Sequence, residues 1–241
     1  MVKKRRQEKI VNSRLLFPII LIYSALLMAL MWNSQPQMWM QGLSIASTTL
    51  FMLALNNRYA LLRVYSRMVS IAYLVLSMML LQEPFGLAES IIPVCFAAFF
   101  FILFNAYQDR QQAGTIFYAF SFIGVSSIFC PQILYFVPLF WFILIVFILA
   151  FSFRTFIASI LGLLLPYWFL AGYYCYEGTP ARIISHITAI VQTKDFFHYA
   201  VINEHQWVNL AVLTFLSIVG TIHFLRNSYL DKIKTRMLYE A

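Results

Sequence analysis

Long apolar segments recur along the sequence, and the short stretches between them carry most of the charged residues. The hydrocarbon core of a bilayer is about 30 Å thick and an α-helix rises about 1.5 Å per residue, so a helix needs roughly 20 apolar residues to cross it. The sequence therefore predicts that residues 15–225 adopt an all-α fold, a polytopic transmembrane helix bundle. Measured against this length it contains eight predicted spans, at about 15–32, 38–56, 68–82, 90–107, 113–130, 133–152, 156–175 and 207–225.

The composition excludes an ordinary soluble domain. Hydrophobic residues make up 62% of the 241 residues and charged residues only 11%, whereas soluble domains are about 25% charged. The net charge of +8 would also suit a nucleic-acid-binding protein. Here, however, the basic residues form short clusters between apolar segments, which is typical of membrane proteins. We therefore expect a lipid bilayer as the partner, and no nucleic acid.

The distribution of basic residues predicts how the helices are oriented. Cytoplasmic segments of membrane proteins are enriched in Lys and Arg. With eight spans and a cytoplasmic N-terminus, every basic residue except Arg182 and Lys194 falls on the cytoplasmic side. One span more or fewer would put alternate clusters on opposite sides, so we expect both termini in the cytoplasm. The cytoplasmic segments are then a basic N-terminal tail at 1–14, connections at 57–67, 108–112 and 153–155, and a basic C-terminal tail at 226–241.

One extracytoplasmic segment, 176–206, is much longer than a turn. Thr179-Pro180 and the helical spacing of the isoleucines that follow predict a short amphipathic helix within it. The segment also contains three histidines and two acids, groups that together could bind a metal or supply a general base. The histidines follow no HExxH or HxxxH spacing, so we favour an ordinary polar loop without a metal site. These candidate residues are His186, His198, His205, Asp195 and Glu204.

Two cytoplasmic connections are very short and carry Arg110 and Arg154. An arginine at such a position can bind the anionic headgroup of a lipid or a lipid-linked phosphate. It can also simply anchor the connection on the cytoplasmic side, and we favour this second role.

Close helix packing is predicted in the span at 156–175. Ala158 and Gly162 stand four residues apart, and small residues at this spacing let two membrane helices approach each other. Pro138 and Pro166 are expected to kink two successive spans, because proline removes a backbone hydrogen bond. A kinked helix can line a cavity, although it is more often just an interior helix.

Ionisable residues are absent from the interior of the predicted spans, and His223, three residues before Arg226, comes nearest. Such residues mark ion and proton pathways, so we do not expect an ion-coupled transporter with a buried carboxylate. The cysteines form no CxxC pair, and no nucleotide-binding or nucleophile motif occurs. The sequence therefore predicts no cofactor.

The phenylalanine-rich spans, the short connections and the segment FSFRTFIASILGLLLPYWF at 151–169 resemble those of bacterial inner-membrane proteins that cross the membrane many times. The resemblance implies a location in the inner (cytoplasmic) membrane. It implies no functional residues.

Three functions are compatible with these features. We favour a non-catalytic subunit or scaffold of a membrane assembly, whose partners would be other membrane proteins. The second is a transporter or flippase for an apolar or lipid-linked substrate, with an internal cavity near Pro138 and Pro166. The third, and least favoured, is an enzyme that acts on an envelope substrate through the segment 176–206.

Overall fold

A computed structural model of the chain describes residues 15–32, 38–59, 68–79, 86–178, 188, 204–227 and 236–238. These residues lie in helices or in short connections, and none of them forms a strand, which confirms the all-α fold. The chain divides into two compact units. The first contains Met1–Ser90 and Ile202–Tyr239, and the second contains Ile91–Val201 and Glu240–Ala241.

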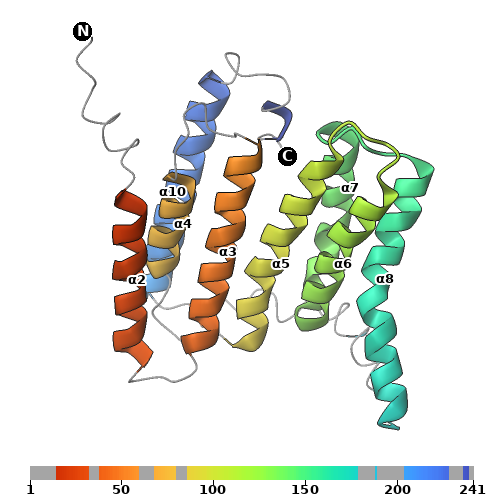
Figure 1. The fold of residues 1–241 in the computed structure, drawn as a ribbon, viewed down its shortest axis with the longest axis horizontal. Helices are drawn as coiled ribbons and strands as arrows, with labels where there is room; N and C mark the ends of the chain where they lie inside the picture. Colours follow the sequence, from red (N-terminus) through yellow and green to blue (C-terminus); the bar gives the residue numbers. More distant parts are fainter. Residues whose placement is uncertain are drawn as a thin grey trace. The chain divides into compact units, whose positions relative to one another are not determined.

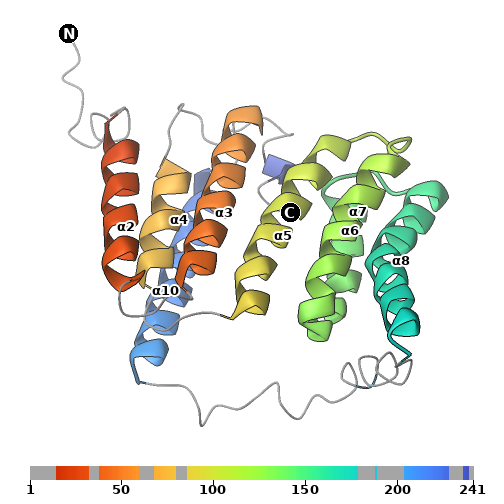
Figure 2. The ribbon, with the colours of Figure 1, turned by 60° about the horizontal axis from the view of Figure 1, so that its bottom comes forward.

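The first unit contains three apolar helices that contact one another: α2 (Leu16–Trp32), α3 (Met38–Tyr59) and α4 (Met68–Met79). Helix α10 (Glu204–Asn227) belongs to the same unit (Figure 1 and Figure 2). Ile45 and Leu74 form the centre of the core, and apolar side chains of α2 and α4 pack against them. Helix α5 (Leu87–Leu103) begins in this unit and continues in the second.

The second unit continues from α5 through a 3-10 turn at Phe104–Ala106 to α6 (Ala113–Phe129). A second 3-10 segment, Pro131–Phe136, then leads directly into α7 (Val137–Val146). Helix α8 (Phe153–Tyr176) completes the unit and packs along α6.

Phenylalanine rings form the core of the second unit. Phe99 of α5 is fully buried, and its ring centroid lies 5.6 Å from that of Phe120 on α6 and 4.8 Å from that of Phe140 on α7. Aromatic pairs of this kind contribute about 0.5–1.5 kcal/mol beyond the area they bury. Phe99 therefore holds three helices together.

Two glycines let α6 and α8 pack backbone against backbone. An ideal Cβ atom at Gly162 of α8 would lie 2.4 Å from the carbonyl oxygen of Phe117, and one at Gly124 of α6 would lie 2.8 Å from that of Leu163. Neither position has room for a side chain. Ala158 is buried one turn before Gly162, so the contact occurs where the spacing of these small residues predicts it.

Three of the described helices are long and apolar enough to cross a membrane: Leu87–Ala106, Phe153–Tyr176 and Gln206–His223. Helix α3 has 22 residues and carries Gln41 and several Ser and Thr side chains among its apolar residues. The number of spans and the cytoplasmic position of both termini remain predictions. Four further apolar helices are shorter: Leu16–Leu30, Met68–Met78, Ala113–Phe129 and Pro131–Val146.

The structure corrects the predicted span at 133–152. Helix α7 ends at Val146, and residues 147–152 are irregular. Leu149 has a φ of 57°, in the left-handed region that interrupts a right-handed helix. Pro138 lies in the first turn of α7, where the 3-10 segment Pro131–Phe136 continues directly into the α-helix, and the kink expected there stays a prediction. Pro166, by contrast, lies inside α8.

Replacing Gly162 by alanine should destabilise the second unit, because the added methyl group would overlap the Phe117 carbonyl oxygen. We expect the free energy of unfolding to fall by about 1–3 kcal/mol, the usual cost of overpacking, in thermal or denaturant unfolding of the purified protein in detergent. Gly172 is the matched control, because it lies on the same helix with nothing within 4 Å of its Cβ position. Gly172→Ala should leave stability unchanged or raise it slightly. Equal effects of the two substitutions would show that α6 does not constrain Gly162.

Candidate functional site

The predicted histidine and acid cluster lies mostly outside the described residues. This applies to His186, Asp195 and His198, and only the backbone of Glu204 and His205 is described, at the start of α10. The amphipathic helix predicted after residue 180 also lies outside the described part. Among the residues that the structure describes, no group of three or more His, Cys, Asp or Glu side chains could hold a metal ion. The cluster therefore stays a prediction.

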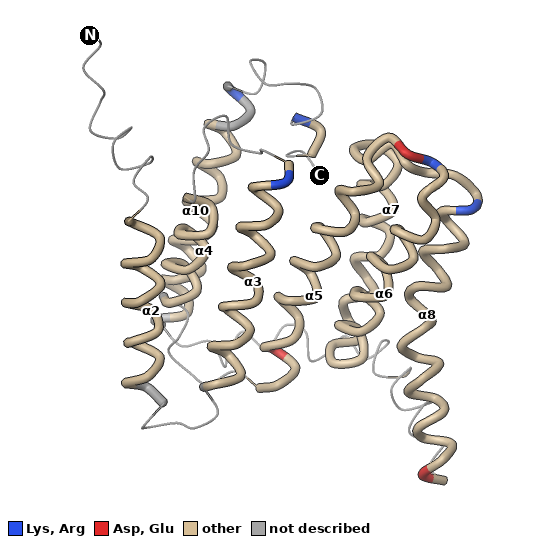
Figure 3. Tube along the Cα trace, viewed as in Figure 1, with Lys and Arg blue, Asp and Glu red and all other residues tan. Residues whose placement is uncertain are grey.

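The two short connections that carry Arg110 and Arg154 lie side by side in the second unit. The backbone N–H of Gln108 donates to the carbonyl oxygen of Ile148 at 2.9 Å. The hydroxyl group of Ser152 donates to the carbonyl oxygen of Arg110 at 3.1 Å. Basic positions of the chain are blue in Figure 3. These hydrogen bonds thus hold together the two connections that carry Arg110 and Arg154, which are separate in the sequence.

Residues 107–112 and 147–154 together form what we term the cationic loop pair. Gln108 and Leu149 have φ values of 60° and 57°, a conformation that costs residues other than glycine about 1–2 kcal/mol. Each of them stands beside the hydrogen bond that joins the two connections. Tertiary contacts therefore hold the pair in one specific conformation.

The cationic loop pair carries an excess of positive charge. Its acid, Asp109, accepts hydrogen bonds from the backbone N–H of Gln111 and the side-chain amide of Gln112, each at 2.9 Å. Arg110 and Arg154 are both exposed, and neither side chain has an ion-pair partner among the described residues. The N-terminus of α8 adds partial positive charge. This surface could contact the anionic headgroup of a lipid.

A capping network at the start of α8 holds Arg154 beside the other connection. The hydroxyl group of Ser152 accepts a hydrogen bond from the backbone N–H of Thr155 at 3.3 Å, and the Thr155 hydroxyl accepts one from the backbone N–H of Ser152 at 2.7 Å. The Thr155 hydroxyl also donates to the carbonyl oxygen of Ala150 at 3.0 Å, and Thr155 is fully buried. These two side chains therefore fix both the helix start and the loop conformation.

Sequence reasoning missed the roles of Ser152 and Thr155. Their spacing resembles that of a capping box, in which a Ser or Thr is followed three residues later by a residue that bonds back. Ser152 and Thr155 lie within a nearly continuous apolar stretch of the sequence. In that stretch, Arg154 was the one residue that indicated a boundary between two helices. The capping pattern was the signal that could have located the start of α8.

Polar side chains in the second unit bond to one another across helices. The hydroxyl group of Tyr167 on α8 donates to that of Ser127 on α6 at 2.9 Å, and the indole N–H of Trp141 on α7 donates to the Ser159 hydroxyl on α8 at 3.1 Å. Ser127 and Ser159 are both fully buried. Next to Tyr167, Pro166 packs against Gly124. The surroundings of Pro166 on α6 and α8 are therefore close-packed.

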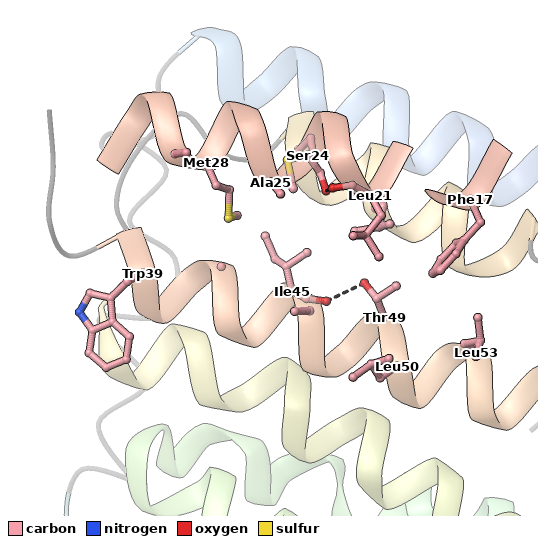
Figure 4. A pocket seen from close by; sticks show the side chains of 15 residues that line it. Phe17, Leu21, Ser24, Ala25, Met28, Trp39, Ile45, Thr49, Leu50 and Leu53 are labelled. Carbon is pink, nitrogen blue, oxygen red and sulfur yellow. Dashed lines mark hydrogen bonds between the residues drawn. The ribbon is translucent and has the colours of Figure 1, made fainter. Parts of the chain in front are cut away.

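An apolar groove of about 560 Å³ lies between α2 and α3 in the first unit, with α4 also contributing to its lining (Figure 4). Its hydroxyl groups, those of Ser24 and Thr49, donate to carbonyl oxygens of their own helices, at 2.8 and 2.6 Å. Sequence reasoning did not predict this groove, because apolar periodicity does not say how far apart two helices stand.

Another face of α3 is buried and polar. The Ser44 hydroxyl donates to the carbonyl oxygen of Ser90 at the start of α5, and Thr48 is 2% exposed. Gln41 is 1% exposed, and its amide group has no hydrogen-bond partner among the described residues. An unpaired buried group of this kind costs about 1–3 kcal/mol. The polar residues that lower the hydropathy of α3 are thus directed into the unit.

No family model, curated protein or solved structure matches the chain. The function therefore has to be argued from geometry. The described residues offer two surfaces with a defined chemistry, the cationic loop pair and the apolar groove.

Removing the Thr155 hydroxyl group should destabilise the cationic loop pair. Thr155→Val keeps the side-chain volume but leaves the Ser152 N–H and the Ala150 carbonyl oxygen without this partner. We expect the free energy of unfolding in detergent to fall by about 1–3 kcal/mol. Thr221→Val is the matched control, because the exposed Thr221 hydroxyl bonds only to the Ser217 carbonyl oxygen of its own helix. A Thr155→Val protein as stable as this control would refute the role assigned to the network.

Proposed function

We propose that this chain is a multi-spanning helical protein of the bacterial inner membrane and acts as a non-catalytic subunit or scaffold of a membrane assembly. The observation that carries the proposal is the exposure of α10. None of its apolar stretch Gln206–His223 is buried, against 39% of the best apolar window in Leu87–Ala106 and 28% in Phe153–Tyr176. A helix with no buried residue in this stretch offers surface to a partner helix.

One side of α10 has the composition of a helix–helix interface. Thr214, Ser217 and Thr221 recur at intervals of three and four residues, which places them on one side of the helix, with Gly220 beside them. Small residues are enriched where membrane helices meet, because they let the backbones approach. Thr214, Ser217 and Thr221 are exposed, and nothing lies within 4 Å of the Cβ position of Gly220, so this side of α10 is open.

The hydroxyl groups on this side of α10 do not make its packing against an apolar helix unfavourable. Thr214 donates to the carbonyl oxygen of Leu210 at 2.9 Å, and Thr221 donates to that of Ser217 at 2.8 Å. Hydroxyls bonded to their own helix carry little desolvation cost into a membrane or an interface. This side of α10 therefore carries small side chains and is open. The hydroxyl protons of both threonines are already donated to carbonyl oxygens of the helix.

The charges at the helix ends support the proposed orientation. In the first unit, Arg58 and Arg226 lie in the last turns of α3 and α10, and Glu89 lies in the first turn of α5 (Figure 3). In the second unit, the cationic loop pair lies at the start of α8 and Glu177 follows its end. Basic residues are enriched on the cytoplasmic side, so we assign the basic ends, and with them both termini, to the cytoplasm.

The transporter alternative has less support. It predicts an internal cavity near Pro138 and Pro166, yet Pro166 packs against Gly124. The enzyme alternative rests on the segment 176–206, of which few residues are described.

The proposal predicts a stoichiometric protein partner that binds at α10. Gentle detergent extraction of the tagged chain should retain another membrane protein. Gly220→Leu should reduce the retained partner about tenfold, equivalent to about 1.4 kcal/mol, because the leucine side chain would fill the open side of the helix.

Gly172→Leu on α8 is the matched control, because its Cβ position is equally open, and it should retain the partner. Both variants should unfold like the unaltered protein. A chain that purifies with no bound protein, or a partner that survives Gly220→Leu, would count against the proposed function.

A further inference from the structure

The cationic loop pair brings two arginines from separate connections within reach of one small anion. The Ser152 hydroxyl group donates to the carbonyl oxygen of Arg110 at 3.1 Å. Arg154 follows Ser152 by two residues, at most about 7 Å of extended backbone. Both arginine side chains are exposed, and neither guanidinium group bonds to another of the described residues. Two long side chains that start this close together can bind the same phosphate group.

The acid of the loop pair leaves an excess of positive charge. One carboxylate oxygen of Asp109 accepts a hydrogen bond from the backbone N–H of Gln111, and the other accepts one from the side-chain amide of Gln112. Both oxygens are thus bonded within their own connection. Residues 107–112 and 147–154 contain no second acid. The first backbone N–H groups of α8, which have no intrahelical acceptor, add partial positive charge beside Arg154.

The conformation of the loop pair is fixed without a ligand. Gln108 and Leu149 have φ values of 60° and 57°, and the backbone N–H of Gln108 donates to the carbonyl oxygen of Ile148 at 2.9 Å. Backbone in this region persists only where the surroundings hold it, and it is often found at binding sites. Preorganised binding groups lose less freedom when a ligand binds.

Exposed apolar side chains lie beside the arginines. Phe153, directly before Arg154, is 77% exposed, and Leu149 and Phe151 are 37% and 38% exposed. Helix α8 begins at Phe153 and is long and apolar enough to cross a membrane, so in a bilayer its first turn would lie between headgroups and hydrocarbon. A free phosphate ion would leave these apolar side chains in water, whereas a lipid would cover them. The combination favours a lipid over a soluble anion.

We propose that the cationic loop pair binds the phosphate group of one anionic phospholipid. Arg110 and Arg154 contact the phosphate from the two connections, since the planar guanidinium group matches phosphate oxygens. Phe151 and Phe153 contact the lipid below its headgroup. The excess positive charge selects an anionic headgroup over a zwitterionic one, whose own cation the arginines repel. This inference concerns a lipid and does not depend on the protein partner proposed for α10.

Lipid binding to the full chain in detergent tests the proposal. Delipidated protein is incubated with equal amounts of phosphatidylglycerol and phosphatidylcholine that carry identical acyl chains, and retained lipids are counted by native mass spectrometry. The protein should retain one phosphatidylglycerol preferentially. An excess of inorganic phosphate should not displace this lipid, because the free ion makes no apolar contact. Displacement by phosphate would show that the loop pair binds a soluble anion instead.

Arg110→Gln and Arg154→Gln should each lower the retention of this phosphatidylglycerol about fivefold, the effect of removing one arginine beside an anionic headgroup. The double variant should lose the same single lipid and no second one, because both arginines bind one phosphate. Arg226→Gln is the matched control. It removes the same charge from an exposed arginine in the last turn of α10, outside the loop pair, and should leave retention unchanged.

All of these variants should unfold like the unaltered protein, because the substituted side chains are exposed. Equal retention of the two lipids would overturn the headgroup assignment. If Arg226→Gln lowered retention as much as the loop-pair variants, the effect would be one of general positive charge and the site would be wrong. A double variant that lost two lipids would overturn the binding of one phosphate by both arginines.

Discussion

The absence of water from a hydrocarbon core is the constraint on which this structure depends. There, every backbone N–H and C=O must find a partner within the protein, and a single segment achieves this as a helix. Hydroxyl side chains obey the same rule: Thr48, Ser121 and Ser126 each donate to a carbonyl oxygen of their own helix at 2.8–2.9 Å. The helix surfaces that remain are apolar, so glycine contacts and aromatic rings decide how the helices meet.

The same constraint explains what could be predicted from the sequence. A helix predicted at 113–130 is observed at Ala113–Phe129, because counting apolar residues is sufficient for a helix bounded by polar connections. The end of α7 could not be found in this way, since residues 147–152 are nearly all apolar. Their backbone bonds back to Ile143 and Leu144 and is joined to residues 107–112 by long-range hydrogen bonds. Likewise, the spacing of small residues identified Gly162 but not the Phe117 carbonyl opposite it.

The candidate sites likewise have some features that the sequence predicts and others that it does not. Arg110 and Arg154 could be predicted one by one as basic residues in short connections, but their common loop structure depends on long-range hydrogen bonds. The groove depends on the distance between two helices, which no sequence pattern records. The second unit is held by close glycine and aromatic contacts, whereas the first unit contains the apolar groove and the exposed helix α10.

The central claim is that the basic helix ends face the cytoplasm and the acidic ends face outside. The two ends of α8 test it most directly, using single cysteines at Arg154 and Glu177 in a chain whose Cys95, Cys130 and Cys175 are replaced by serine. A membrane-impermeant thiol reagent should label Glu177→Cys in intact cells, and should label Arg154→Cys only after the membrane is opened. Labelling of both cysteines in intact cells, or the reverse pattern, would contradict the claim that α8 crosses the membrane from the cytoplasm outwards.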